Sequence, residues 1–431
     1  MTDPRRVVPR TDRMLADPQL AAATRRLGPA AVKAVVVEVQ QLIRTGALDP
    51  VGAVPAVLDR LPSRASTLTP VLNATGVVLH TNLGRAPLSQ AAIEALCAAA
   101  GYVDVEYDRF SGARARRGRG ALAALAQAVP AAEDVLVVNN GAAALLLATT
   151  VLAADRPLVV SRGELVEIGD GFRLPELIES TGVRIHEVGT TNRTSARDYV
   201  AAVAAGAGAI LKVHPSNFRI SGFTSACSVA ELAQLTVPVI VDVGSGLLQP
   251  EPLLPDEPDV STALSDGAAV VTASGDKLFG GPQAGLIFGR ADAMQQLRRH
   301  PMARALRVDK LTLAGVEATL RGPQPPTWRY LTAPAEELRD RCQRIADALP
   351  GAEVVPSGGA VGGGGAPGVS LAGWAVSVEE RLAEALRTGE PVVVGRISNG
   401  RCLLDPRCIE PADDDALIAA VRAAREEQGS R

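Results

Sequence analysis

The sequence predicts an α/β fold built on a mainly parallel sheet, and three observations lead to this prediction. Short apolar runs alternate with helical patterns between about residues 66 and 310. Strands of that length between helices imply βαβ units, whose strands pair in parallel. Polar residues directly follow several runs, at the strand ends where such sheets bind ligands. The chain has 431 residues, of which 47% are hydrophobic, and can bury this core together with smaller domains.

Residues 1–65 read as a small helical domain. Apolar side chains recur there at the three- and four-residue spacing of a helix face, at Val32, Val35, Val36, Val39, Leu42 and Ile43. Gly46 then follows as a helix stop. Residues 1–64 carry ten basic and six acidic side chains, a net charge of +4, whereas the whole chain carries −3. This asymmetry favours a module that faces RNA, and an ordinary solvated helix surface explains it as well.

Residues 66–310 form the predicted large domain, which would hold the catalytic site. We expect its strands at seven apolar runs, namely VLVV (135–138), PLVV (157–160), VRIHEV (183–188), AILKV (209–213), VPVIVDV (237–243), AVVTAS (269–274) and AGLIFG (284–289).

Residues 311–431 form a predicted smaller C-terminal α/β domain. We expect helices near 334–349, 376–388 and 413–426, and strands near 368–372, 391–397 and 401–404. Ser398-Asn399-Gly400 is typical of a tight hairpin turn between two of these strands. The glycine-rich stretch 358–368 lacks the Lys-Ser/Thr pair of a phosphate-binding P-loop, so we interpret it as a connection.

Composition excludes several classes of protein. A net charge of −3 argues against a polycation that coats nucleic acid. The five cysteines are scattered and contain no C-x-x-C pair, which argues against a disulfide framework and a zinc site and favours the reducing cytoplasm. No apolar stretch follows the charged N-terminus and no run of eighteen apolar residues occurs, so we predict neither export nor membrane insertion.

The strongest local signal is SGDKLFGGP (274–282), which places Lys277 just after a predicted strand and before a glycine-rich turn. Burying a charged lysine costs on the order of several kcal/mol, so an interior lysine normally has a covalent or ionic partner. Desolvation and nearby cations would lower its pKa and make it a nucleophile toward an aldehyde. Taken alone, the segment fits a lysine that reaches the surface or pairs with Asp276 at least as well.

Other residues shift this balance. Asp242 ends a predicted strand 35 residues before Lys277, where it can pair with a protonated pyridine nitrogen. Ser274 can donate to a phosphate group. Asn140-Gly141-Ala142 follows a strand and opens a helix, whose first N–H groups and dipole favour a phosphate dianion. In this order on an alternating chain, these features resemble the type I fold of pyridoxal-phosphate enzymes, so we predict pyridoxal 5'-phosphate as the cofactor.

A set of arginines indicates a second anion. Arg85 lies in the turn HTNLGRAPLS, Arg304 and Arg307 lie three residues apart, and four arginines crowd the loop 114–119. Guanidinium groups match phosphate-like oxyanions with two parallel hydrogen bonds. A solvated basic surface explains the 114–119 run more readily than it explains Arg85.

The four histidines show no metal-ligand spacing, so we predict no metal site and interpret them as polar residues near the site or in the core. His214, which follows the predicted strand 209–213, is the one that we assign to the cofactor site.

Seven segments between about residues 70 and 408 resemble, in order, the bacterial selenocysteine synthase family: LNATGVVLHTNLGRAPLS (72–89), RGELVEIGDGFRLPE (162–176), EVGTTNRT (187–194), KVHPSNFRISGFT (212–224), DVGSGLL (242–248), SGDKLFGGPQAG (274–285) and RALRVDKLTLAGVEATL (304–320). The resemblance implies that Lys277 carries the cofactor as a Schiff base and that serine esterified to tRNA(Sec) is the substrate. Lys277 or a neighbour would take the serine Cα proton. Loss of the β-hydroxyl would leave an aminoacrylyl-tRNA, to which selenium from selenophosphate adds.

The same resemblance implies roles for further residues. Asp276 would orient the lysine or manage its proton. Arg85, Arg304, Arg307 and one arginine of the 114–119 loop would bind selenophosphate. The family's loop pattern G-K-R-G-S-R stands here as GARARR (112–117), so we choose Arg117 and keep Arg119 as the alternative. The N-terminal domain would grip the tRNA, and the chain would assemble into a ring of dimers, a homodecamer.

Two other functions stay open at this stage. A related pyridoxal-phosphate lyase would act on a free amino acid or an amino sugar phosphate with the same lysine, and it would show no binding of seryl-tRNA(Sec) at low salt. A non-catalytic RNA-binding scaffold on a decayed enzyme fold would show no cofactor absorbance. The intact set of Asp242, Ser274, Asp276 and Lys277 argues against the scaffold.

Overall fold

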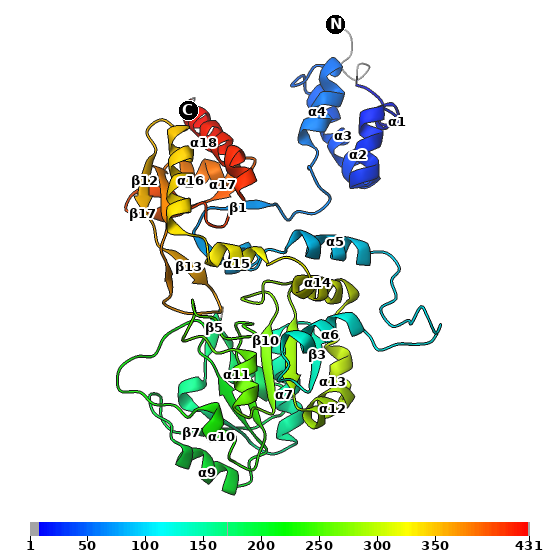
Figure 1. The fold of residues 1–431 in the computed structure, drawn as a ribbon. Helices are drawn as coiled ribbons and strands as arrows, with labels where there is room; N and C mark the ends of the chain where they lie inside the picture. Colours follow the sequence, from blue (N-terminus) through cyan, green and yellow to red (C-terminus); the bar gives the residue numbers. More distant parts are fainter. Residues whose placement is uncertain (1–7, 170, 430–431) are drawn as a thin grey trace. The chain divides into compact units, whose positions relative to one another are not determined.

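The computed structural model describes residues 8–169 and 171–429, so the first seven residues of the predicted N-terminal domain lie outside the described residues. The chain divides into two compact units, Met1–Pro70 and Val71–Arg431 (Figure 1). Within the described ranges, no helix combines the length and apolar character needed to cross a bilayer. The predicted domain boundaries at residues 65 and 310 stay predictions.

The first unit is helical, as its apolar spacing predicts. Its helices are α1 (Thr11–Leu15), α2 (Pro18–Leu27), α3 (Pro29–Arg44) and α4 (Ala53–Arg60). Val32, Val36, Val39 and Ile43 of α3 are buried in one apolar cluster with residues of the other three helices. Helix α3 ends at Arg44, and Gly46 follows with a φ of 74°, the left-handed backbone that favours glycine after a helix.

A seven-stranded sheet forms the centre of the second unit, and all seven predicted strands belong to it. In spatial order they are β3 (Asp134–Val138), β11 (Gly285–Gly289), β10 (Val270–Ser274), β9 (Val239–Asp242), β8 (Ala209–Val213), β4 (Leu158–Ser161) and β7 (Ile185–Val188). β11 pairs antiparallel with both β3 and β10, and the other four pairings in this sheet are parallel. The prediction of an α/β fold with a mainly parallel sheet is therefore confirmed.

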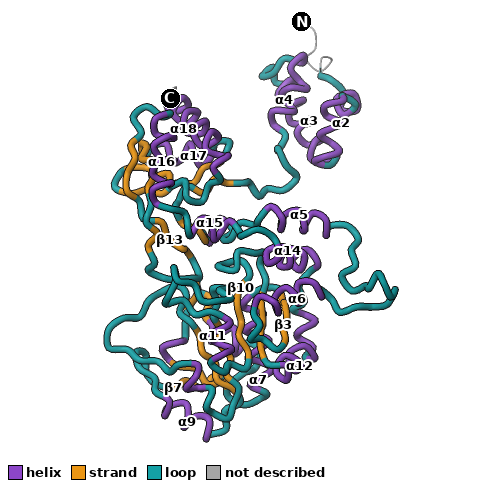
Figure 2. Tube along the Cα trace, in the orientation of Figure 1, coloured by secondary structure: helices purple, strands orange, loops and turns teal. Residues whose placement is uncertain are grey.

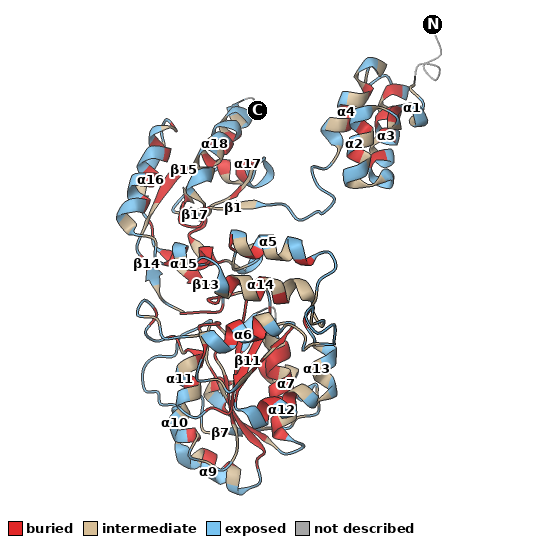
Figure 3. Cartoon of the chain, turned by 45° about the vertical axis from the view of Figure 1, so that its right-hand side comes forward, coloured by how far each residue is buried: buried red, intermediate tan, exposed pale blue. Residues whose placement is uncertain are grey.

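Helices cover both faces of this sheet (Figure 1, Figure 3), and alternate side chains of the strands are buried in two different apolar clusters. Residues such as Val137, Val241 and Val271 pack against α6 (Arg119–Ala128), α9 (Ala196–Ala204), α10 (Val229–Leu232), α11 (Val260–Ser265) and α14 (Lys310–Arg321). Their neighbours Val138, Ile240 and Val270 pack against α7 (Gly141–Ala153), α8 (Leu174–Glu179) and α12 (Ala291–Arg299). Because both faces are covered, the strand ends are left as the place for chemistry.

The C-terminal region has a four-stranded antiparallel sheet in the order β12 (Glu353–Pro356), β15 (Trp374–Glu379), β18 (Arg401–Leu404) and β17 (Arg396–Ser398). Helices α16 (Ala335–Asp347), α17 (Leu382–Thr388) and α18 (Asp414–Gly429) pack on it. The predicted hairpin is confirmed, because Asn399 and Gly400 join β17 to β18 with φ values of 50° and 72°.

The helix predicted over 376–388 is wrong in its first half. Residues 374–379 form β15, and the helix begins only at Leu382. Val376 and Val378 are fully buried and lie two residues apart, which is the alternation of a strand and not the spacing of a helix face. β-branched side chains at this spacing fit the strand that pairs with β12 and β18.

Two strands near the start of the second unit pair with strands far along the chain. β1 (Val71–Asn73) lies parallel to β16 (Val392–Val394), and β2 (Val77–Leu79) lies parallel to β13 (Gly359–Gly362), which also pairs with β14 (Ser370–Leu371). The glycine-rich stretch interpreted as a connection therefore contains a strand (Figure 2). The remaining elements are α5 (Gln90–Ala99), β5 (Glu167–Gly169), β6 (Phe172–Arg173), α13 (Pro301–Ala305) and α15 (Pro326–Leu331).

We expect the substitution Val36→Ala to lower the free energy of unfolding of the first unit by about 2 kcal/mol, because it removes two methyl groups from a fully buried site in α3. Hydrogen exchange of the full chain measures this as faster exchange in residues 11–60, with residues 71–429 unchanged. Val37→Ala is the matched control, since Val37 is 46% exposed. Equal effects of the two variants would contradict the described packing.

Candidate active site

Lys277 lies in the turn that follows β10, and its residue is only 8% exposed. Gly364, from the glycine-rich stretch, covers it: a Cβ added at Gly364 would lie 2.6 Å from the Lys277 Cε and 2.7 Å from its Nζ. Burial lowers the pKa of Lys277, while the negative charge of Asp242 opposes that shift and the positive charge of Arg85 adds to it. The structure therefore supplies an amine that loses its proton more readily than an exposed lysine does.

Asp242 is the last residue of β9 and faces the same region. The parallel register places it opposite Thr272 of β10, whose hydroxyl donates a 2.7 Å hydrogen bond to the Asp242 Oδ1. Burial raises the pKa of Asp242, and the Thr272 hydrogen bond and the charges of Lys277 and His214 act against that rise. A carboxylate held here fits a cationic ring nitrogen, whose charge would hold it ionised.

A candidate phosphate cradle lies at the start of α7. Asn140 caps this helix by accepting a 2.8 Å hydrogen bond from the Ala143 N–H. A Cβ at Gly141 would lie 2.4 Å from the Ser274 Oγ, so the serine hydroxyl points directly at the first turn of the helix. The N–H groups of that turn, including those of Gly141 and Ala142, together with the Ser274 hydroxyl suit a phosphate dianion.

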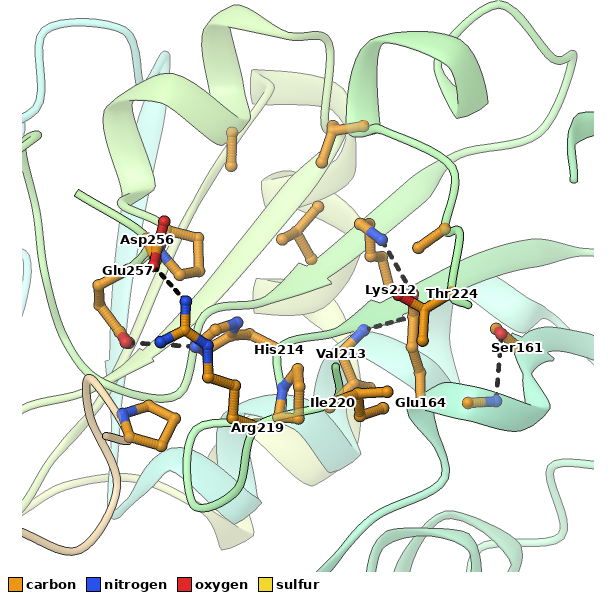
Figure 4. Close-up of a pocket in the computed structure, with 18 of the residues that line it drawn as sticks. Ser161, Glu164, Lys212, Val213, His214, Arg219, Ile220, Thr224, Asp256 and Glu257 are labelled. Atoms are coloured by element: carbon orange, nitrogen blue, oxygen red, sulfur yellow. Dashed lines mark hydrogen bonds and ion pairs between the residues drawn. The ribbon is translucent and has the colours of Figure 1, made fainter. Parts of the chain in front are cut away.

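His214 follows β8 and is held by a buried acid (Figure 4). Its Nε2 lies 3.2 Å from the Glu257 Oε2, which also accepts a 2.6 Å hydrogen bond from the Ala366 N–H. The glycine-rich stretch that covers Lys277 is thus tied to His214 through Glu257. Nearby, Glu164 pairs with Lys212 at 2.9 Å and accepts from the Val213 N–H (Figure 4).

Arg85 and Asp276 form an ion pair beside the lysine, with 2.9 Å between the Arg85 Nη1 and the Asp276 Oδ2. The Ala86 N–H also donates to the Asp276 carbonyl, which fixes the two turns together. The sequence left open an ion pair between Lys277 and Asp276. In the structure, Asp276 forms its ion pair with Arg85 instead.

The other arginines gather around Glu106. Arg114, Arg117 and Arg307 each form an ion pair with its carboxylate, and hydrogen bonds from Arg114 and Arg117 lower the pKa of Glu106. The backbone of Arg307 bridges to Val138 at the end of β3, next to the phosphate cradle. Arg304 is exposed, and Arg119 pairs with Asp104 instead.

The structure therefore brings Lys277, Asp242, Ser274 and His214 to one edge of the sheet, with the Asn140–Ala142 turn beside them. It separates the four predicted anion-binding arginines, because Arg85 lies at the lysine, Arg117 and Arg307 pair with Glu106, and Arg304 is exposed. Sequence reasoning missed Glu257, Gly364 and Glu106. No local signal could have found them, because Glu257 lies in a proline-rich acidic run, Gly364 in a glycine run and Glu106 in a polar loop.

Comparison with known proteins gives a coherent result. Residues 71–410 match the family model described as L-seryl-tRNA selenium transferase, and residues 5–44 match the model of the selenocysteine synthase N terminus. An L-seryl-tRNA(Sec) selenium transferase of Moorella thermoacetica is 44% identical over 389 residues, covering 84% of this chain and 83% of the relative. One of Yersinia pestis is 40% identical over 451 residues, covering 96% and 97%.

Among solved structures, a D-glucosaminate-6-phosphate ammonia-lyase is similar with a TM-score of 0.58 and 22% identity, covering 84% of this chain and 96% of that one. At that identity the similarity shows the fold alone. The predicted type I fold of pyridoxal-phosphate enzymes is confirmed.

We expect reductive methylation of Lys277 by formaldehyde, in the cofactor-free chain, to rise with pH to a midpoint below the ordinary lysine value of 10.5, because only the neutral amine reacts. Asp242→Asn should move the midpoint lower still, since it removes a charge that favours the ammonium form. Peptide mass spectrometry measures both, with exposed Lys33 as the internal comparison. A midpoint at or above 10.5 would contradict the described burial.

Proposed function

The chain belongs to the L-seryl-tRNA selenium transferase family, and on that premise we propose that it converts L-seryl-tRNA(Sec) to L-selenocysteinyl-tRNA(Sec) with pyridoxal phosphate as cofactor and selenophosphate as selenium donor. One observation carries the proposal: the family match spans the whole of the site, and within it a buried lysine lies near a strand-end aspartate and a candidate phosphate cradle.

The residues present fit the cofactor. The Asn140-Gly141-Ala142 turn and Ser274 would hold its phosphate, Asp242 its ring nitrogen, and His214 its ring edge or face. Gly141 leaves the cradle free of a side chain that would fill it. When bound, pyridoxal phosphate supplies an aldehyde that Lys277 and the substrate amine can both engage and a ring that withdraws electrons from the serine Cα.

Lys277 is the group that moves protons in this proposal. Burial lowers the pKa of Lys277, which favours the free amine that would accept the serine Cα proton and later return it. Asp276 acts as a positioning residue, because its carboxylate is held by Arg85 while its backbone leads directly into Lys277. Gly364 packs over the amine and excludes water from it.

Arginines would hold the selenium donor. Arg85 lies beside the lysine, Arg117 and Arg307 pair with Glu106, and the exposed Arg304 lies three residues before Arg307. A selenophosphate there must compete with the Glu106 carboxylate for Arg117 and Arg307. The reaction balances, because the serine β-hydroxyl leaves as water, the donor's selenium takes its place on Cβ, and a water molecule releases the donor's phosphate.

The first unit would bind the tRNA, and its net charge of +4 over residues 1–64 supports this role. Its sequence match to the selenocysteine synthase N terminus supports it further. We also propose the assembly typical of the resemblance, a homodecameric ring of dimers, and a cytoplasmic location, where charged tRNA is available.

The small-molecule lyase is not favoured. Its support is a 22% identical structure, which shows the fold alone, whereas relatives named as seryl-tRNA(Sec) transferases are 40–44% identical over most of the chain.

The deciding assay incubates the purified protein with seryl-tRNA(Sec), with and without selenophosphate, and identifies the amino acid on the tRNA. We expect selenocysteinyl-tRNA only with the donor present, and none with Lys277→Ala, since no other described amine occupies its place. Cofactor absorbance that responds to free amino acids but never to the charged tRNA would replace this function with the lyase.

We expect Arg117→Met to raise the KM for selenophosphate about tenfold or more, because a charge-assisted hydrogen bond is lost. Exchange of the seryl Cα proton with solvent, which precedes selenium addition, should be unchanged. Arg119→Met is the matched control, since Arg119 pairs with Asp104. The reverse result would assign the donor site to Arg119.

A further inference from the structure

A cavity of about 1020 Å³ lies next to His214, within the unit Val71–Arg431 (Figure 4). Its walls are the ends of β4 and β8, the loop 215–226, the proline-rich loop 250–259 and the segment 366–369. His214 and Glu257 line it, whereas Lys277 and Asp242 do not. The volume is at the upper end of the roughly 300–1,000 Å³ typical of small-molecule sites, so it holds far more than a serine side chain.

Glu257 points to a ligand in this cavity. Its side chain is only 1% exposed, and its Oε2 accepts hydrogen bonds from His214 and Ala366. Its Oε1 is buried and has no hydrogen-bond partner among the residues that the structure describes. A buried carboxylate oxygen without a hydrogen-bond donor destabilises the folded protein. A ligand that places an N–H group at this oxygen would therefore bind more tightly than one without it.

Phe218 supplies a second, independent feature. It lines the same cavity and is 39% exposed, so its ring is accessible to a ligand there. Exposed aromatic rings in binding sites stack against the flat faces of nucleobases. An aromatic platform together with an unpaired carboxylate acceptor matches a base that carries an exocyclic amine.

The cavity lies within reach of the reacting lysine. Gly364 packs on the Lys277 side chain, and Ala366, two residues later, donates to Glu257 at the cavity wall. Two residues span at most about 7 Å. That length matches an aminoacyl ester that joins an amino acid at the lysine to a ribose in the cavity.

We propose that this cavity binds the terminal adenosine of the aminoacyl-tRNA, with its base on Phe218 and its exocyclic amine donating to the Glu257 Oε1. The inference rests on the proposed function, because every tRNA carries its amino acid as an ester on a terminal adenosine. The cavity would hold that nucleoside while the seryl group reaches Lys277.

The test uses a stable probe, 3'-seryl-amido-3'-deoxyadenosine, titrated calorimetrically into the cofactor-loaded full chain. Phe218→Ala should weaken its binding about fivefold or more, the loss expected for one stacked base. Phe172→Ala is the matched control, because Phe172 is also 39% exposed and does not line the cavity. Its affinity should equal that of the unmutated protein.

A change in the probe tests the Glu257 contact without altering the protein. Replacing adenine by purine, which lacks the exocyclic amine, should weaken binding about tenfold or more, because a hydrogen bond to a buried charge is lost. Free adenosine and AMP should bind much more weakly than the seryl probe. Equally tight binding of AMP would overturn the tRNA terminus as the occupant in favour of a free nucleotide.

The failures are distinguishable. The protein could convert seryl-tRNA(Sec) while its affinity for the probe is unchanged by Phe218→Ala and by removal of the exocyclic amine. That result would overturn the nucleoside site and leave the proposed function standing. Probe binding that depends on Phe218 and on the amine would support the site even in a chain that transfers no selenium.

Discussion

The site depends on one constraint, the burial of an amine among charges that nearly balance. Lys277 is covered by Gly364 and faces the carboxylates of Asp242, Asp276 and Glu257, while Arg85 supplies an opposing positive charge. Burial has the largest effect of these, so the pKa of Lys277 lies below that of an exposed lysine. Three features surround this buried amine: the register of β9 against β10 sets the position of Asp242, the Arg85–Asp276 pair lies beside the lysine, and Gly364 leaves room for its side chain.

Most of the fold could be predicted from the sequence, because its central strands are short apolar runs separated by amphipathic helices. The hairpin at Asn399-Gly400 was equally readable, since both residues adopt the left-handed backbone that its turn requires. The two failures have different causes. Val376 and Val378 lie two residues apart, a strand alternation that the predicted helix over 376–388 overlooked. The glycine-rich stretch pairs with β2, almost three hundred residues earlier, and a local pattern cannot indicate so distant a partner.

Some residues of the candidate site could likewise be predicted from the sequence and others could not. Lys277, Asp242, Ser274 and the Asn140 turn could be predicted, because each follows a strand and parallel strands end at one edge of the sheet. Their roles toward a cofactor stay predictions. Glu106, Glu257 and Gly364 could not be predicted, because their contacts form only in the folded chain. Glu106 pairs with three arginines, Glu257 accepts from His214 and the Ala366 N–H, and Gly364 packs on Lys277.

The pairing of β1 with β16 and of β2 with β13 has a consequence for how the chain is made. Residues 71–79 leave the ribosome early, yet their partners at 359–362 and 392–394 are synthesised about three hundred residues later. At roughly 5–20 residues per second, the wait is on the order of tens of seconds. The central sheet has all its strands well before then, so Gly364 is set over Lys277 among the last events of biogenesis. A nascent chain would thus hold its reactive amine uncovered until translation is almost complete.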